Sequence, residues 1–515
     1  MDERLIPAAL VVLAFLLRLG PVLRGGGLRG LGNYDDGVYY GAAVAIVDGR
    51  VPYRDFVLLH PPGLPYLVLP FAALGRVVGE ANGWVIARVC FMALAAAGAA
   101  LSYAVARRFG CVSAILAGLT YACWEPALHA ENTTSLEIPQ NVLILMALLL
   151  IGRPDASPTN REERHGGGRL QQLLGRGQAR FVLAGAALGL SACVKIWGVV
   201  PLVVIAIWQL LVGGPRRVAR LAVGAAVAGI LVCGPTLVLA PGPMVRMVIE
   251  AQLTRAASVG LASRAVQMFG GDAVAAQGAA LGRVQVAGLI FVLVGALALS
   301  CLLTPGARIF AVLLGVEVLL LLASPPYYSH YATILTPALS LVAGVGAGRL
   351  VAWRTRIGRV AAVAAAGGVA AVAATQMGGG WRLRESPVYP AAVVAPFVSS
   401  AHCVAADMPS VLILSGILTR NIEHGCPLRI DFTGATYVND RVVGAHGVPV
   451  SRTRNSLWQR DMASYLTSEP VAVLARGIDG ISAPTWRLIY RRMHRVAWSH
   501  GVLVLVRLTS PHEIR

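Results

Sequence analysis

The sequence predicts an all-α, polytopic membrane domain followed by a soluble α/β domain. Of the 515 residues, 56% are hydrophobic and only 13% are charged, whereas soluble domains carry about 25% charged residues. Apolar windows of about 17–25 residues recur through residues 1–376, which is typical of a multi-pass membrane protein. Beyond them the apolar runs shorten and alternate with helical patterns. We therefore divide the chain into a transmembrane domain, residues 1–376, and a C-terminal domain, residues 377–515.

About eleven apolar runs are candidate membrane spans. They cover residues 5–23, 84–106, 111–128, 137–152, 180–196, 197–213, 219–240, 284–303, 308–324, 331–350 and 359–376. The first is interpreted as a retained span, because no small-residue cleavage site follows it. The run at 62–79 contains three prolines, and we interpret it as a juxtamembrane or re-entrant helix. Only then do the arginine-rich loops gather on the side of the N-terminus, as the positive-inside rule requires.

This arrangement places the N-terminus in the cytoplasm and the C-terminal domain outside the cytoplasmic membrane. The loop 24–83, the loop 241–280 and the motif 324–330 then lie on the outer face. Residues 244–269 have apolar positions at helical spacing, interrupted by Arg246, Arg255 and Arg264, which predicts a helix along the outer membrane surface. The loop 153–179 is rich in Gly, Arg and Gln and is predicted to be cytoplasmic and disordered.

The net charge of +19 does not indicate a nucleic-acid partner. Most of the basic excess lies in short loops between apolar runs, where the positive-inside bias explains it. Membrane lipids are the expected surroundings of this chain.

The C-terminal domain is predicted to contain a small α/β layer. Val411–Leu414, Val471–Leu474 and Val502–Val506 resemble short buried strands, and Ser456–Leu466 and Pro484–Trp498 resemble helices. Two of the eight cysteines, Cys403 and Cys426, lie in this polar region. They are candidates for a disulfide in an oxidising compartment, with two free thiols as the alternative.

An acidic pair, Asp35 and Asp36, follows the first span. One interpretation is structural: Asp35 is the N-cap of a short helix that carries Tyr39, and its neighbour is solvated. The other is chemical, because adjacent carboxylates repel each other and are best tolerated where a function uses them. A carboxylate at a membrane face could deprotonate a hydroxyl or bind a sugar.

Two basic residues stand near the same face. His60 precedes Pro61 and Pro62, which fix the backbone where the chain re-enters the interface. It could donate a hydrogen bond to a phosphate, or it could be an interfacial histidine without a ligand. Lys195 is the only lysine among the 44 basic residues and lies between two apolar runs. A lysine at that depth is costly and usually marks a function, although it could also extend to the interface.

Further polar residues lie at the predicted outer ends of spans. Glu137 either begins a helix as a favourable dipole partner or has a functional role. Arg88 could pair with Glu137 or with a loop aspartate. Tyr328 and His330 belong to a tyrosine-rich motif that an interfacial aromatic belt explains, although it could also line a sugar or phosphate site. No metal-binding or nucleotide-binding motif is evident, so we expect no metal and no cofactor.

In their order along the chain, these pieces resemble a known family. An acidic pair after one span, a Tyr-containing helix, a basic residue before Pro-Pro, Arg88, Glu137 and a Lys in Leu-x(4)-Lys-x-x-Gly are similar to the C-type glycosyltransferases. The resemblance covers about residues 1–350 and is to the branch that contains protein O-mannosyltransferases and lipid A aminoarabinose transferases. The pair is Asp-Asp here, where Asp-Glu is commoner.

The resemblance implies a polyprenyl-phosphate-sugar-dependent transferase at the outer face of the cytoplasmic membrane. Asp35 would be the catalytic carboxylate, with Asp36 supporting it or binding the sugar. Donor-phosphate binding is then expected of one group of residues, namely His60, Lys195 and Tyr39. Supporting or substrate-binding roles are expected of a second group, namely Arg88, Glu137, Tyr328 and His330. No cofactor is implied, since the lipid-linked donor is already activated.

The implied acceptor is a cell-envelope glycan, lipid or protein, and mannose or arabinofuranose is the expected sugar. A secondary transporter or a flippase of envelope precursors is the alternative, because such proteins also carry polar groups in membrane helices. A third interpretation is an envelope scaffold whose outer domain binds partners. The transporter interpretation predicts polar groups near the middle of the bilayer, whereas the candidates here gather at one face.

Overall fold

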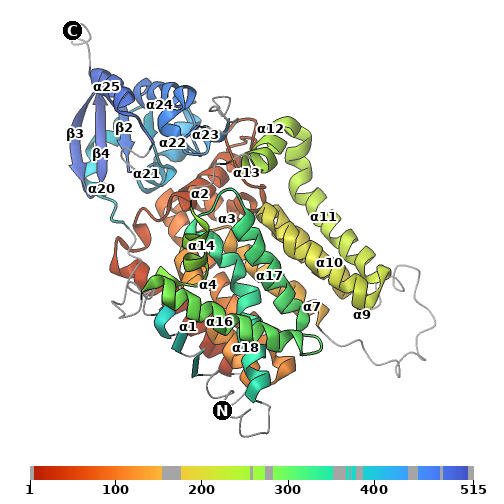
Figure 1. Cartoon of the computed structure of the whole chain (residues 1–515). Coiled ribbons are helices and arrows are strands. Elements are labelled where there is room, and N and C mark those ends of the chain that lie inside the picture. The colour runs from red at the N-terminus through yellow and green to blue at the C-terminus, as the bar shows by residue number, and fades with distance from the viewer. Residues whose placement is uncertain are drawn as a thin grey trace.

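The computed structural model describes residues 5–152, 176–253, 255, 259–272, 282–351, 367–368, 371–372, 374–377, 387–438, 450–475 and 480–508. It shows a bundle of helices, with the C-terminal domain placed at the end opposite the N-terminus (Figure 1). The predicted loop 153–179 and the predicted span 359–376 lie mostly outside the described residues.

Long helices form most of the bundle. In chain order they are α1 (Leu5–Arg24), α2 (Tyr34–Val47), α3 (Gly63–Val78), α4 (Glu80–Ala106), α5 (Cys111–Cys123), α6 (Glu125–Ala130), α7 (Glu137–Ile151), α9 (Arg176–Val194), α10 (Val199–Gly213), α11 (Pro215–Leu239), α16 (Arg283–Leu302), α17 (Arg308–Ala323) and α18 (Thr336–Val351). Short elements connect them: η1 (Gly27–Arg29), η2 (Arg107–Phe109), η4 (Ile196–Gly198), α12 (Pro241–Val245), η5 (Arg246–Glu250), α13 (Ala251–Leu253), α14 (Leu261–Met268) and η6 (Ser329–Leu335).

Within the described residues, six helical segments are long and apolar enough to cross a membrane. They are Leu5–Arg24, Glu80–Phe109, Ile196–Gly213, Pro215–Leu239, Arg283–Leu302 and Ser329–Leu350. Four further apolar helices, α3, α5, α7 and residues 178–194, are shorter. A polytopic membrane protein is confirmed, but the predicted count of about eleven spans is not. The predicted run 111–128 ends early, because Trp124 is extended and a separate short helix, α6, follows it.

Small residues allow the bundle helices to approach closely. Gly185 and Gly189 of α9 face the backbone of α11, and Gly224 of α11 faces the backbone of α9. A Cβ at any of these positions would collide with the opposite main chain. Close packing through small residues is the usual basis of helix association in a membrane, where apolar burial from water contributes little.

The C-terminal domain has a four-stranded mixed sheet in the order β1-β2-β4-β3. Its elements are α20 (Ala391–Val398), β1 (Val404–Ala406), α21 (Pro409–Leu414), α22 (Leu418–Glu423), α23 (Ala435–Val438), η7 (Arg452–Arg454), α24 (Ser456–Ser468), β2 (Val471–Leu474), α25 (Ala483–Arg492), β3 (Met493–Ser499) and β4 (Val502–Arg507). β1 and β2 pair in parallel, and the other pairs are antiparallel. The sulfur atoms of Cys403 and Cys426, the predicted pair, are bonded to each other.

Two predicted elements of this domain are wrong. Residues 411–414 form part of the helix α21 and not a strand, and residues 493–498 belong to β3 and not to a helix. The helix α25 ends at Arg492 because the chain then pairs with β4 through a tight turn. His500 and Gly501 both have positive φ there, the backbone conformation of a two-residue hairpin turn. The predicted strands at 471–474 and 502–506 and the helix at 456–466 are present.

The C-terminal domain shares a hydrophobic core with the helix α2. Val38 and Val44 of α2 are buried in one cluster with Val411, Ile413 and other residues of the domain. Gly37 lies so close to Ser410 that no side chain would fit between them. The carboxylate of Glu80, at the start of α4, accepts hydrogen bonds from the backbone of α22. The domain is therefore packed tightly on the helix that carries the acidic pair.

Candidate active site

The two aspartates lie in the first turn of α2 but face different surroundings. Asn33, and not Asp35 as predicted, is the N-cap: its side chain accepts a hydrogen bond from Asp36 N at 2.9 Å. Successive helical residues point about 100° apart. The side chain of Asp35 is 44% exposed, whereas that of Asp36 is fully buried.

Asp36 is bonded on both carboxylate oxygens. Arg88 donates from Nε to Oδ2 at 2.7 Å, and its guanidinium stacks over the ring of Trp84 at 3.6 Å. The other oxygen accepts from Trp84 Nε1 at 3.1 Å and from the backbone and hydroxyl of Thr134. Arg88 thus pairs with the loop aspartate and not with Glu137. These contacts fix the start of α2 relative to α4 and to the loop before α7.

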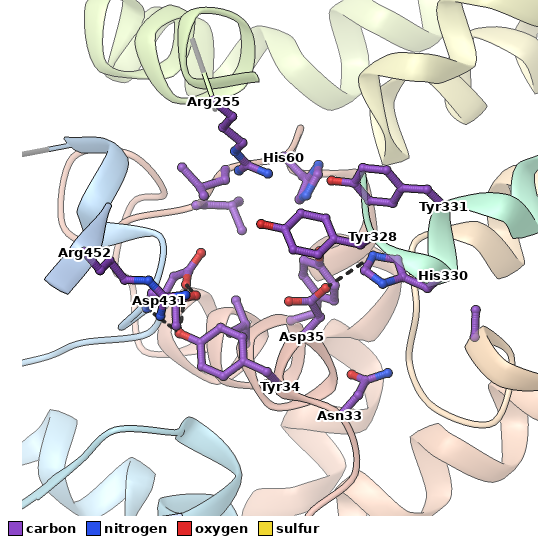
Figure 2. Close-up of a pocket in the computed structure, with 16 residues that line it drawn as sticks. Asn33, Tyr34, Asp35, His60, Arg255, Tyr328, His330, Tyr331, Asp431 and Arg452 are labelled. Carbon is purple, nitrogen blue, oxygen red and sulfur yellow. Dashed lines mark hydrogen bonds and ion pairs between the residues drawn. The ribbon is translucent and has the colours of Figure 1, made fainter. Parts of the chain in front are cut away.

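Asp35 faces a cavity of about 260 Å³ between the bundle and the C-terminal domain (Figure 2). Its lining comes from seven parts of the chain: Asn33, Tyr34, Asp35, Val38 and Tyr39; Leu58, Leu59 and His60; Ala130; Arg255; Tyr328, His330 and Tyr331; Asp431 and Thr433; and Arg452. His330 Nε2 lies 3.8 Å from Asp35 Oδ2. Five of the predicted site residues, Asp35, Tyr39, His60, Tyr328 and His330, therefore converge on one cavity.

His60 and Arg255 lie together at one end of the cavity (Figure 2). Burial lowers the pKa of His60 well below its usual value, and electrostatic interactions with Lys195, Arg255 and His330 lower it further. The imidazole is therefore neutral at neutral pH. Its Nδ1 is buried and has no hydrogen-bond partner among the residues that the structure describes. Burial also raises the pKa of Tyr39 well above its usual value, so its hydroxyl remains protonated.

Lys195 lies behind this lining and not in it. Its ammonium is 2.6 Å from Glu137 Oε1, and both side chains are about 2% exposed. The same ammonium lies 4.0 Å from the centre of the Tyr331 ring. Glu137 reaches a small adjoining cavity that Asp35 and His330 also line. A buried ion pair therefore supports the wall of the main cavity from the side of α7 and α9.

The C-terminal domain closes the cavity opposite Asp35 and His330 (Figure 2). Tyr34 donates its hydroxyl hydrogen to Asp431 Oδ1 at 2.8 Å and accepts from Thr433 N at 2.8 Å. Arg452, at the start of η7, completes this wall. Burial is the main cause that raises the pKa of Asp431; hydrogen bonds from Gly434 and Tyr34 lower it, and Asp35 raises it.

Sequence reasoning missed three charged residues of the cavity. Arg255 lies in the predicted interfacial stretch 244–269, where its spacing indicated only membrane contact. Asp431 and Arg452 come from the C-terminal domain, where no motif marks them. They reach the cavity only because that domain packs on α2.

The chain resembles solved structures of other proteins at low sequence identity. No protein-family model and no curated protein matches the sequence. Among solved structures, the chain resembles ArnT from Cupriavidus metallidurans bound to undecaprenyl phosphate, with 16% identity, a TM-score of 0.59 and 98% of each chain covered. The apo form of that protein matches with a TM-score of 0.58, 15% identity and the same coverage.

A second resemblance is to the archaeal oligosaccharyltransferase AglB from Archaeoglobus fulgidus, in complex with an inhibitory peptide and a dolichol-phosphate. The identity is 12%, the TM-score is 0.51, and 99% of this chain and 74% of that chain are covered. ArnT and AglB are both C-type glycosyltransferases. This protein has the fold of the C-type membrane glycosyltransferases.

Proposed function

We propose that this protein transfers a sugar from a polyprenyl-phosphate carrier to an acceptor hydroxyl at the outer face of the cytoplasmic membrane. The observation that carries the proposal is one cavity that combines the exposed carboxylate of Asp35 with Arg255 and His60. Support also comes from the fold, since the similar structures hold undecaprenyl phosphate and dolichol-phosphate.

The proposed base is Asp35. It is the exposed carboxylate of the acidic pair, and its ion-pair partner among the described residues, His330, is as far as 3.8 Å away. The acceptor oxygen attacks the anomeric carbon of the sugar while Asp35 takes the hydroxyl proton. The bond from that carbon to the phosphate oxygen breaks, and the carrier leaves as polyprenyl phosphate.

The proposed phosphate site lies at the end of the cavity formed by Arg255 and His60. A guanidinium is well suited to phosphate, because it presents several donors in one plane. The neutral imidazole can donate one further hydrogen bond, and it adds no charge. These groups stabilise the negative charge that develops on the leaving phosphate. We propose no cofactor, since the bond in the donor is already activated.

Two buried ion pairs position these groups. The pair of Asp36 with Arg88 fixes the first turn of α2 and hence Asp35. The pair of Glu137 with Lys195 supports Tyr331, and its ammonium acts on the phosphate through the electrostatic field and not by contact. Because Lys195 is not among the residues that line the cavity, we propose this indirect role for it in place of phosphate contact.

The proposed acceptor is a glycan, lipid or protein of the cell envelope, and mannose or arabinofuranose is the proposed sugar. The N-terminus is proposed to be cytoplasmic and the cavity extracytoplasmic. A lipid carrier can then enter the cavity from the bilayer while the acceptor comes from outside.

A transfer assay tests the proposal. Membranes that contain the full-length protein are incubated with radiolabelled undecaprenyl-phosphate mannose or arabinofuranose and with envelope extract, and label in the acceptor fraction is measured. Transfer that depends on Asp35 supports the proposal. Movement of intact labelled lipid between leaflets without transfer would instead identify a flippase. If neither transfer nor lipid movement is seen with any sugar donor, the transferase and the flippase interpretations are both contradicted.

A further inference from the structure

The wall that the C-terminal domain contributes to the cavity is built around one oriented carboxylate. Asp431 Oδ1 accepts hydrogen bonds from Tyr34 Oη at 2.8 Å, from Gly434 N at 2.7 Å and from Thr433 Oγ1 at 3.3 Å. Two of these donors belong to the domain and one belongs to α2. The carboxylate is thus fixed in the plane that places its second oxygen, Oδ2, away from Tyr34.

The segment that carries Asp431 is held firmly. Trp458 is fully buried, donates from Nε1 to Phe432 O at 3.2 Å and packs edge-to-face on the Phe432 ring. Arg429 forms an ion pair with Asp461 of α24 at 2.5 Å. A side chain presented on such a support keeps its geometry, which is a requirement of a specific binding group.

A purely structural role accounts for only one of the two carboxylate oxygens of Asp431. Oδ1 makes every hydrogen bond that stabilises the turn at 431–434 and its contact with Tyr34. Oδ2 accepts no hydrogen bond among the residues that the structure describes, although Asp431 lines the cavity. A largely buried carboxylate is costly unless hydrogen-bond donors satisfy it. Hydroxyl groups of a bound ligand would supply such donors.

The position of Asp431 indicates which bound group supplies these hydrogen-bond donors. Arg255 and His60 mark the phosphate end of the cavity, and Asp35 lies on the wall opposite Asp431 (Figure 2). The acceptor hydroxyl must reach Asp35 to lose its proton. The remaining wall is therefore left to the sugar that is joined to the phosphate.

We propose that Oδ2 of Asp431 accepts hydrogen bonds from hydroxyl groups of the transferred sugar, so that the C-terminal domain selects the sugar. The ligand class is a neutral sugar with free hydroxyl groups on ring carbons remote from the phosphate. This inference rests on the proposed function. Asp431 is a specificity residue in it and takes no proton from the acceptor.

The test compares the bare carrier with carriers that bear a sugar. The purified full-length protein in lipid nanodiscs is titrated with undecaprenyl phosphate and with a panel of undecaprenyl-phosphate sugars: mannose, arabinofuranose and glucose. We expect one sugar to increase the affinity over the bare carrier. Asp431→Asn should then weaken binding of that sugar-bearing ligand by about tenfold or more, the typical effect of losing a hydrogen bond to a charged group. Binding of the bare carrier should change less than about twofold.

Two further variants complete the test, the first as a control and the second as an independent way to disturb Asp431. Glu423→Gln removes an exposed carboxylate of the same domain outside the cavity lining and should leave both affinities unchanged. Tyr34→Phe removes the hydroxyl that orients Asp431 and should weaken only the sugar-bearing ligand.

Three outcomes would overturn the inference. In the first, Asp431→Asn lowers the affinity for the bare carrier and for the sugar-bearing carrier equally. In the second, Asp431→Asn leaves the affinity for the sugar-bearing carrier unchanged. In the third, no sugar-bearing carrier binds the wild-type protein more tightly than the bare carrier does. Failure of the proposed function has a different signature, since the carrier itself would then not bind or Asp35→Asn would transfer sugar normally.

Discussion

Asp35 and Asp36 are adjacent in sequence, but only one of them is available for chemistry. Asp36 is enclosed by Arg88, Trp84 and Thr134, whereas Asp35 faces the cavity. The structural interpretation of the acidic pair is wrong, because Asn33 is the N-cap and Asp36 is buried in an ion pair, whereas the chemical role of Asp35 stays a prediction. The sequence could not assign the two environments, because the assignment depends on which residue caps α2. Asn33 does so, and this rotates Asp36 inward.

Asp35→Asn is expected to reduce transfer by about 10²–10⁴-fold, the usual contribution of a general base. The fold should persist, because the side chain is 44% exposed and makes one long contact. Asp36→Asn is the comparison variant: it leaves Arg88 buried beside a neutral group, so it should lower thermal stability. Initial transfer rates of the purified variants measure the effect on catalysis, and their melting temperatures measure the effect on stability. Normal transfer by Asp35→Asn would remove this residue from the mechanism.

The charge state of His60 gives a prediction about pH. Burial and nearby positive charge lower its pKa well below 6.5. The unfolded chain then binds more protons than the folded protein as the pH falls below about 6.5, so the contribution of His60 to stability is lost on acidification and is complete above that pH. Between pH 6.5 and 8 the imidazole stays neutral, and its hydrogen bond to the donor phosphate should not change.

The measurement is the donor KM of His60→Gln divided by that of the wild type. This ratio should stay constant between pH 6.5 and 8, because any other group that titrates affects both proteins alike. A ratio that falls toward one as the pH rises would mean that His60 carries a proton at the start of this range.

At the scale of elements, short apolar runs limited what the sequence could predict. Val411–Leu414 has the composition of a buried strand, yet it forms α21, with Pro409 in the first turn. A run of four such residues fits a strand or a buried helix equally well. The strands β2 and β4 were predictable because turn residues bound them on both sides. β3 was missed because Tyr490, Arg491 and Arg492 continue the helical pattern of α25 up to its first residue.

The ion pair between Glu137, at the start of α7, and Lys195, just after α9, predicts strong coupling of the two residues. Lys195→Met alone leaves the carboxylate of Glu137 buried without a partner, which costs about 3–5 kcal/mol. Glu137→Gln alone leaves the ammonium in the same position. The double variant removes both charges and should be more stable than the sum of the two single effects predicts. Unfolding free energies in detergent, measured for all four proteins, test this. Additive effects would mean that the pair does not exist in the folded protein.

At the scale of the whole molecule, the cavity is complete only when the two domains are docked. The polytopic bundle, the α/β domain and the convergence of Asp35 with His60 and His330 could be predicted from composition and from residue order. The contribution of Asp431 and Arg452 could not be predicted, because it depends on how the C-terminal domain packs on α2. The shared core with α2 determines that packing, and buried apolar residues give no sequence signal of their partner.

Glu80 is the residue by which this docking can be tested. Its carboxylate accepts hydrogen bonds from Leu418 N at 3.1 Å and Thr419 N at 2.5 Å, at the start of α22. Hydrogen bonds to a charged group contribute about 1.5–3 kcal/mol, so Glu80→Ala should loosen the domain. We expect faster amide hydrogen exchange at 418–423 and a higher donor KM. Glu423→Ala, which removes an exposed carboxylate at the other end of α22, should change neither. Faster exchange with an unchanged KM would show that the cavity works without a docked domain.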